Sequence, residues 1–373
     1  MINLLLNEYK LIIRKLGGTN LMKKKFKIAS IILSVCILGS MLYGCGKEKK
    51  ETLNFMNYGE NIGEGILEEF EEKYGIHVNQ EVYDAPEEMY QKIAAGAAQY
   101  DVVVSIDYLV QRMIQEDRLE KINFSNVSNM DKIEGDHLRK SFDPNNEYSV
   151  PYMSGTIGIV YNTDYVKDPI DSWTALWNPE YQNNVVLLDG VRDSLGAVLK
   201  MLGYSVNTTN QDEINEARDK LIELKKNGNL LAIGSDDNTD KMARGEAAIS
   251  ILWSGEGLNL EAEHDNLKFV VPKEGANFWI DSLCIPKGTK NKEDAELFIN
   301  YLSEKDPSYR TAEEIGYTTP QKEAREEQDD EIKNNPNAYM PEEILAKCES
   351  YDYLGDKLKM YEEAWTQFKD YKE

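Results

Sequence analysis

Aromatic side chains and carboxylates occur together at the ends of several predicted strands in this chain of 373 residues. Tyr58 ends the first predicted strand, Glu60 follows two residues later, and Trp253 ends a later strand. Trp279 and Asp281 lie two residues apart, and because alternate residues of a strand face the same side, both should point into one space. Ligands of open parallel sheets bind beyond the carboxyl ends of the strands, so these residues are candidates for a binding site.

An aromatic face beside a carboxylate suits a ligand that carries ammonium groups on a methylene chain. Each ring face attracts a cation by roughly 0.5–2 kcal/mol, and each carboxylate can accept a charge-assisted hydrogen bond from an ammonium group. A single aromatic residue near a strand end is more often part of the core, and loop carboxylates are usually solvated. The coincidence at several strand ends, taken alone, leaves the two interpretations evenly balanced.

The charge of the chain excludes two classes of partner. It contains 42 Lys and Arg against 66 Asp and Glu, a formal net charge of −24. Nucleic-acid binding and adhesion to anionic lipid both require a basic surface, so neither is expected. The sequence contains no Walker loop, dinucleotide-binding glycine motif, nucleophile elbow or metal-ligand spacing of His and Cys, so we expect no cofactor and no metal site.

The N-terminal 45 residues predict a leader rather than part of the fold. Four lysines between positions 23 and 27 precede an apolar run at 28–42, which is too short for a membrane span of roughly 20 residues and is typical of a signal peptide. The run ends in Leu-Tyr-Gly-Cys, which resembles the bacterial lipobox, and Cys45 is then the lipidation site that anchors the protein to the outer face of the membrane. An ordinary secretory signal or a single membrane anchor are the alternatives.

The remaining segments around this leader complete the domain prediction. We expect residues 22–45 to be the lipoprotein signal peptide, 46–51 a linker, and 1–21 either a start-site artefact or a genuine extension. Residues 1–45 contain seven basic residues and one acidic residue, so the mature chain has 35 basic against 65 acidic residues. Only Cys284 and Cys348 remain in it, and whether they pair is left open.

The rest of the chain predicts an α/β protein. Strands are predicted at 53–58, 76–83, 101–105, 156–161, 185–188, 247–253, 269–271 and 282–286, and helices at 63–74, 86–98, 108–116, 195–203, 213–226, 238–244, 292–303 and 355–371. The regular alternation up to residue 116 predicts a parallel sheet with right-handed crossovers. Because no Pro- or Gly-rich linker divides the chain, we expect two lobes built from non-contiguous segments.

From residue 53 to about residue 373, the chain resembles the spermidine/putrescine-binding proteins of bacterial polyamine ABC transporters. The most specific matching stretches are 142–152 (FDPNNEYSVPY), 278–283 (FWIDSL) and 315–320 (IGYTTP). The resemblance implies a type II periplasmic-binding-protein-like fold, in which two α/β lobes enclose a ligand cleft and close about a hinge. We expect lobe 1 to contain 52–155 and 278–325, and lobe 2 to contain 156–277 and 326–373, with crossings near 153–156 and 278–281.

The resemblance also implies which side chains contact the ligand. The matching aromatic and acidic positions are Tyr58, Glu60, Tyr108, Asp193, Trp253, Trp279, Asp281 and Tyr317. Asn61 and Tyr351 are two further candidates at positions where the family has other residues, a Tyr and a Gln. Asp193 stands where the family commonly has Glu, and Gly190 stands where a ligand-binding Asp is often found. The loss of that carboxylate leaves open which polyamine is preferred.

The function that the resemblance implies is capture of spermidine or putrescine outside the cytoplasm and delivery to membrane permease subunits. Such a protein is a monomer held to the membrane through lipid on Cys45, and it is not an enzyme. One alternative is a binding protein of the same fold for a different cationic or small polar solute. Another is an extracellular glycosidase, in which Asp189 with Asp193, or Glu60 with Asp281, would act as acid and base.

Overall fold

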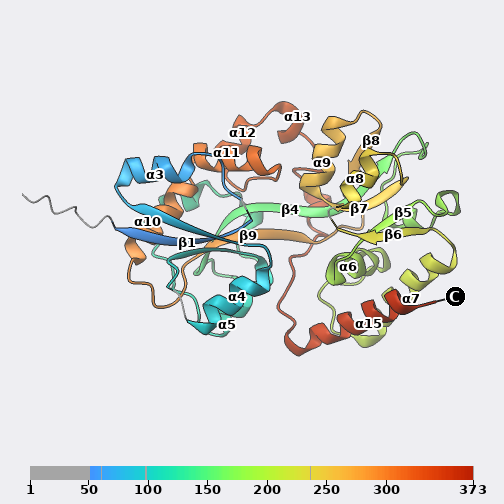
Figure 1. Ribbon diagram of the computed structural model, residues 1–373, viewed down its shortest axis with the longest axis horizontal. Coiled ribbons are helices and arrows are strands. Elements are labelled where there is room, and N and C mark those ends of the chain that lie inside the picture. The colour runs from blue at the N-terminus through green and yellow to red at the C-terminus, as the bar shows by residue number, and fades with distance from the viewer. Residues whose placement is uncertain (1–50, 60, 97–98, 236, 373) are drawn as a thin grey trace, which may run out of the picture. The chain divides into compact units, whose positions relative to one another are not determined.

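The computed structural model describes residues 51–59, 61–96, 99–235 and 237–372 (Figure 1). Four predicted features lie outside the described residues: the leader, the linker residues before position 51, the proposed lipidation site Cys45 and the site candidate Glu60. Nine strands of the described residues form one sheet in the order β2-β1-β3-β9-β4-β7-β5-β6, with β8 paired to β4. None of the helices in these ranges is both long and apolar enough to cross a membrane.

The first lobe begins with the predicted alternation of strands and helices. Strands β1 (Thr52–Tyr58), β2 (His77–Tyr83) and β3 (Val102–Ser105) pair in parallel and alternate with helices α3 (Ile66–Tyr74), α4 (Pro86–Ala95) and α5 (Asp107–Gln115). Phe70 of α3 and Phe298 of α10 (Lys292–Leu302) pack on one face of the sheet, and Met89 of α4 and Met113 of α5 pack on the other. The parallel α/β arrangement predicted for this region is confirmed, and Figure 1 shows helices on both faces.

Two antiparallel strands connect the first lobe to the second. Strand β4 (Ser149–Asn162) pairs with β9 (Phe278–Cys284) as far as Thr156. From Ile157 onward it pairs instead with β7 (Ile249–Trp253) and β8 (Leu267–Val270). Because β9 is also antiparallel to β3, the sheet is mixed. Figure 1 shows β4 and β9 running side by side between the two groups of elements.

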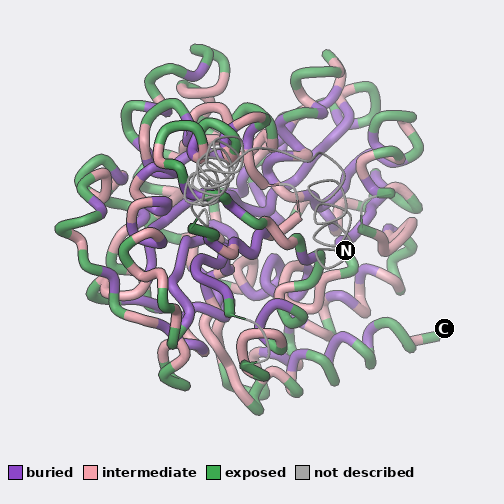
Figure 2. Tube along the Cα trace, turned by 60° about the vertical axis from the view of Figure 1, so that its left-hand side comes forward, coloured by how far each residue is buried: buried purple, intermediate pink, exposed green. Residues whose placement is uncertain are grey.

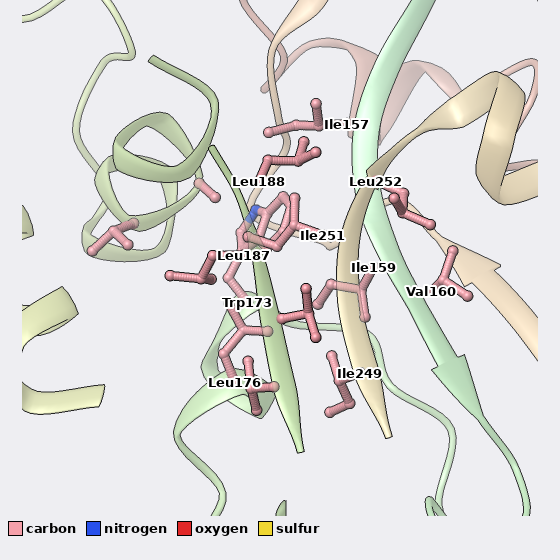
Figure 3. Close-up of a cluster of buried hydrophobic side chains, with 14 of the residues drawn as sticks. Ile157, Ile159, Val160, Trp173, Leu176, Leu187, Leu188, Ile249, Ile251 and Leu252 are labelled. Carbon is pink, nitrogen blue, oxygen red and sulfur yellow. The ribbon is translucent and has the colours of Figure 1, made fainter. Parts of the chain in front are cut away.

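The second lobe contains the larger hydrophobic core. Strand β5 (Val185–Leu188) pairs in parallel with β6 (Leu230–Gly234) and with β7. Its helices are α6 (Val191–Leu202), α7 (Gln211–Lys226), α8 (Asp237–Ala243), α9 (Ser254–Glu263) and α15 (Leu358–Asp370). Trp173 is fully buried among Ile157, Leu187 and Ile251 (Figure 3), and its indole N–H donates to the Gly275 carbonyl at 2.9 Å.

The remaining elements are short or lie near the C-terminus. Helices α11 (Lys305–Ile315), α12 (Lys322–Glu327), α13 (Asp330–Lys333) and α14 (Glu342–Leu345) follow α10, and 3₁₀ turns lie at Ser128–Lys132, Gly135–His137, Trp173–Trp177, Pro179–Tyr181 and Gly355–Lys357. The chain then returns to the second lobe, where α15 packs against α6 and α7. Figure 2 shows buried stretches inside each lobe and exposed stretches on the outer helices. The two-lobed α/β fold predicted from the sequence is confirmed.

Candidate functional site

A cavity of about 920 Å³ lies at the carboxyl ends of strands from both lobes. Tyr58 ends β1 and Trp253 ends β7, while Asp189 follows the last residue of β5. The first turns of α5 and α6 also reach the cavity, and β9 crosses it with Trp279 and Asp281. This is the edge of an α/β sheet at which ligands bind, because loops and helix N-termini meet there.

All nine described candidates from the sequence line this one cavity. They are Tyr58, Asn61, Tyr108, Asp193, Trp253, Trp279, Asp281, Tyr317 and Tyr351. The shared face predicted for Trp279 and Asp281 is present, because both face the cavity while Phe278 and Ile280 face a hydrophobic core cluster. The strand that carries them, β9, begins at Phe278 rather than at the predicted residue 282. The structure therefore brings together residues that are up to 293 positions apart in the chain, from Tyr58 to Tyr351.

Two aromatic rings form one corner of the cavity. The rings of Trp279 and Tyr317 meet edge to face, with centroids 4.9 Å apart. Trp279 lies opposite Gly155 in the β4–β9 register. A Cβ atom at Gly155 would come within 2.4 Å of the Trp279 indole. A Cβ atom at Gly255 would come within 2.6 Å of the Tyr317 ring. The two rings thus occupy space that side chains at these glycines would fill, a packing relation that sequence reasoning missed.

Asp281 is a buried carboxylate on the cavity wall. It is only 5% exposed, and this burial raises the pKa of its side chain to about 7. No described residue donates a hydrogen bond to its carboxylate or forms an ion pair with it. A charged carboxylate in such a place is stabilised by a cation that binds directly to it.

Asp193 is a second carboxylate on the wall, in the first turn of α6. Its Oδ1 accepts a hydrogen bond from the Tyr351 hydroxyl at 3.2 Å. Burial raises the pKa of Asp193, while the Tyr351 hydroxyl and the Arg192 guanidinium oppose that rise. Arg192 lies over the Tyr351 ring at 4.0 Å and donates to the Asp352 carbonyl and to the Asn207 side chain. The Arg192 guanidinium therefore joins the chain next to Tyr351 to the segment that follows α6.

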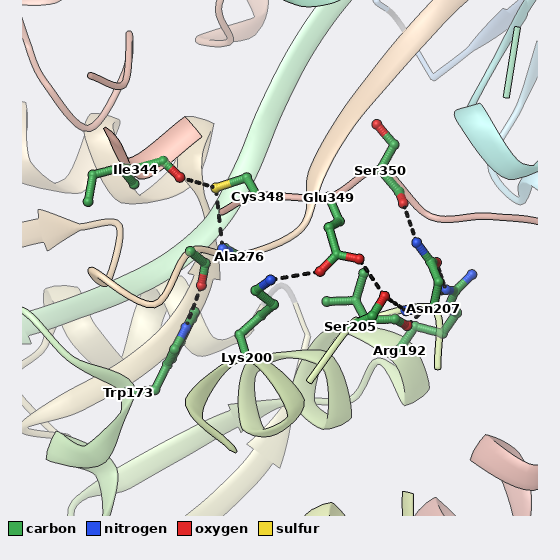
Figure 4. Close-up of polar contacts among 12 residues, drawn as sticks. Trp173, Arg192, Lys200, Ser205, Asn207, Ala276, Ile344, Cys348, Glu349 and Ser350 are labelled. Atoms are coloured by element: carbon green, nitrogen blue, oxygen red, sulfur yellow. Dashed lines mark hydrogen bonds and ion pairs between the residues drawn. The ribbon is translucent and has the colours of Figure 1, made fainter. Parts of the chain in front are cut away.

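Tyr351 reaches the cavity from a segment that we call the C-terminal strap, residues 348–353. Glu349 of the strap pairs with Lys200 at 2.7 Å, and the Ser350 carbonyl accepts from Asn207 at 2.9 Å (Figure 4). Backbone hydrogen bonds join Glu349 to Ala276 and to Phe278. These contacts hold the strap between α6 and the start of β9, and they fix where the Tyr351 side chain lies.

The cavity wall contributed by α5 carries Tyr108, which contacts a carboxylate of α4 and follows a buried aspartate. The Tyr108 hydroxyl donates to Glu87 at 2.7 Å. The preceding residue, Asp107, is fully buried and accepts from the backbone N–H groups of Tyr108 and Tyr351 at 2.7 and 3.2 Å. Burial raises the pKa of Asp107 to about 8. The N–H groups partly compensate for this burial and link α5 to the C-terminal strap.

The cavity lining contains several carboxylates that sequence reasoning missed. Among the described residues, eight acidic side chains line the cavity against two guanidinium groups, those of Arg112 and Arg192. Both guanidinium groups already have partners, because Arg112 pairs with Glu116 at 3.0 Å and Arg192 donates to the Asp352 carbonyl. Glu256 is the clearest omission, since it follows Trp253 by three residues in a helix that periodicity did not reveal. The lining favours a cationic ligand.

The described residues include no group of His, Cys, Asp and Glu side chains placed to hold a metal ion. Cys284 and Cys348, whose pairing the sequence left open, are both free thiols.

Asp189, one member of an acid–base pair that the sequence allowed for a glycosidase, forms an ion pair with Lys369 at 2.9 Å. An ion-paired carboxylate of this kind does not suit general acid or base chemistry with Asp193.

Comparisons with known proteins agree with this geometry. Residues 65–341 match the family model described as bacterial extracellular solute-binding protein. The chain is 38% identical over 324 residues to the spermidine/putrescine-binding periplasmic protein of Salmonella typhimurium, covering 86% of this chain and 92% of that protein. The corresponding protein of Escherichia coli K12 is 37% identical over 327 residues, with the same coverage.

Solved structures give the same result. The spermidine/putrescine ABC transporter substrate-binding protein of Streptococcus pneumoniae matches with a TM-score of 0.80 and 36% identity, covering 86% of this chain and 98% of that chain. A lipoprotein of Treponema pallidum matches with a TM-score of 0.76 and 27% identity, covering 85% of this chain and 99% of that chain.

Proposed function

The chain belongs to the family of bacterial extracellular solute-binding proteins, and we propose that it is the polyamine-binding component of an ABC importer. The relatives reported above are substrate-binding proteins of transporters rather than enzymes. The proposal takes the ligand to be putrescine, spermidine or both, bound as a cation in the cavity between the lobes.

The observation that carries the proposal is the environment of Asp281. Its carboxylate is buried, lines the cavity beside Trp279, and has no described hydrogen-bond donor or cationic partner. An ammonium group of the ligand would supply the missing donor and positive charge. The rings of Trp279 and Tyr317 would then contact the adjacent methylene groups and contribute cation–π attraction.

The lobes would close on the ligand by bending where chain segments cross between them. We propose lobe 1 as 52–155 with 278–325 and lobe 2 as 156–277 with 326–373, because β4 changes its partner from β9 to β7 between Thr156 and Ile157. Closure about such a hinge removes water from the cavity and strengthens each ion pair inside it.

We also propose the cellular context. Residues 22–45 act as a lipoprotein signal peptide, Cys45 receives the lipid, and the protein works as a monomer on the outer face of the membrane. The basic cluster, apolar run and cysteine of the sequence support the lipid anchor, as does the relative from Treponema pallidum, which is itself a lipoprotein. The closed protein would deliver its ligand to the permease subunits of the importer.

A solute panel tests the proposed function. Calorimetric titration of the purified chain with putrescine, spermidine, cadaverine and spermine should show binding, and titration with glucose or glutamine should show none. Asp281→Asn should weaken polyamine binding by about tenfold or more, since a charge-assisted contact is lost. Asp168→Asn is the matched control, because Asp168 is exposed and does not line the cavity. If none of the four polyamines bound, the assignment of the solute would be wrong.

A further inference from the structure

The carboxylate of Asp193 occupies the space that a side chain at position 190 would need. Gly190 precedes α6 with φ −119° and ψ 118°, an extended conformation that any residue can adopt. The glycine is therefore not required by the backbone. A Cβ atom built at Gly190 would lie 2.1 Å from Asp193 Oδ2 and 3.0 Å from its Cγ, well inside van der Waals contact.

The second oxygen of the Asp193 carboxylate is held by a hydrogen bond from Tyr351. This oxygen, Oδ1, accepts the hydrogen bond from the Tyr351 hydroxyl, and Tyr351 is itself buried under the Arg192 guanidinium. The backbone N–H of Tyr351 donates to the buried Asp107, so the tyrosine has little freedom to move. The Asp193 carboxylate therefore lies between Gly190 and Tyr351, on the α6 wall of the cavity.

We propose that Gly190 is a specificity-determining residue, because the absence of its side chain lets the Asp193 carboxylate lie back against the end of β5. The proposal rests on the proposed function, in which carboxylates of the cavity bind the ammonium groups of the ligand. Asp193 on α6 and Asp281 on β9 stand on different walls, so the place of each carboxylate sets the length of diamine that can reach both.

A methyl group at position 190 would displace the Asp193 carboxylate. Gly190 and Asp193 both line the cavity, and Tyr351 with Arg192 fills the space beside them, so the carboxylate turns toward the cavity. The separation between Asp193 and Asp281 then shortens, and shorter diamines gain relative to longer ones. The glycine is thus a positioning element for Asp193 rather than a ligand contact itself.

The test measures affinity for 1,3-diaminopropane, putrescine and cadaverine, which differ only in the number of methylene groups. Gly190→Ala should change the affinity ratio of 1,3-diaminopropane to cadaverine by about tenfold in favour of the shorter ligand, the scale of one charge-assisted hydrogen bond. In an Asp193→Ala background the same substitution should change that ratio by less than about twofold, because no carboxylate is left to displace. Gly135→Ala is the control, since a Cβ atom there meets nothing within 4 Å.

Two results would overturn the inference while the proposed function stands. One is a Gly190→Ala protein that binds diamines with the wild-type order of preference. The other is an equal change of order in the Asp193→Ala background, which would mean that position 190 acts without Asp193. Asp193→Glu provides a second variant that leaves position 190 untouched, and it should also favour shorter diamines because it extends the carboxylate by one methylene. A wild-type protein that bound no diamine would instead refute the proposed function itself.

Discussion

Asp281→Asn should make the ligand-free protein more stable at neutral and alkaline pH, although it should weaken ligand binding. Asp281 is buried and has no described cationic partner, so its charged form is destabilised in the folded state. The groups that sense its charge are Asp107 and the hydroxyls of Tyr83, Tyr152 and Tyr317, all of which have pKa values raised in part by Asp281. None of these neighbours is a cation.

The size of the effect follows from the raised pKa. The unfolded chain releases the Asp281 proton near the usual value of 3.8, whereas the folded chain keeps it until about pH 7. Between these values the folded state binds more protons, so the free energy of unfolding falls as the pH rises through this range and levels off above it. At roughly 1.4 kcal/mol per pKa unit, the ionised carboxylate costs the folded protein about 4 kcal/mol at pH 8, in order of magnitude.

Urea denaturation of the ligand-free wild type and of Asp281→Asn at pH 4.5 and pH 8 checks this reasoning. The variant should gain several kcal/mol over the wild type at pH 8, on the scale of the roughly 4 kcal/mol above, and little at pH 4.5. Asp168→Asn, at an exposed position, should show no such pH-dependent difference. An Asp281→Asn protein that is equally or less stable at pH 8 would refute the reasoning, because it would mean that the wild-type carboxylate is already compensated.

The aromatic corner and the ionic contacts lead to further expected outcomes. Trp279→Ala should weaken putrescine binding by about tenfold, the scale of a lost cation–π contact, and wild-type affinity in calorimetry would remove this ring from the site. Gly155→Ala should lower the stability by about 1–3 kcal/mol through overpacking, because its Cβ would come within 2.4 Å of the indole. An unchanged melting temperature would contradict that packing. Putrescine affinity should fall as salt rises to roughly 0.5 M, and an affinity indifferent to salt would argue against carboxylates as the binding groups.

Much of the first lobe could be predicted from the sequence because its signals are local. The run 101–105 is uniformly apolar apart from its ends, and its residues 102–105 form the buried strand β3. The Gly75 that ends α3 adopts φ 75°, as expected for a helix C-cap glycine. The prediction that Trp279 and Asp281 face the same side also required only the two-residue period of a strand.

The parts of the fold that could not be predicted from the sequence depend on contacts between residues far apart in the chain. The first half of β4 contains Pro151 at an irregularity in the register, which breaks the pattern of an ordinary central strand. The antiparallel pairing of β9 with β3 joins segments about 180 residues apart, and local periodicity does not encode it. The close approaches at Gly155 and Gly190 are likewise visible only once the strands and helices are packed.

The claim that a cation binds at Asp281 is tested most directly by proton release. At pH 7 a carboxyl with a pKa of about 7 is half protonated, so binding of an ammonium group that ionises it should release about half a proton per ligand. Calorimetric titration with putrescine in two buffers of different ionisation enthalpy measures this number. We predict that the wild type binds with this release and that Asp281→Asn binds weakly with none. Wild-type affinity in Asp281→Asn, or no binding by the wild type, would contradict the account.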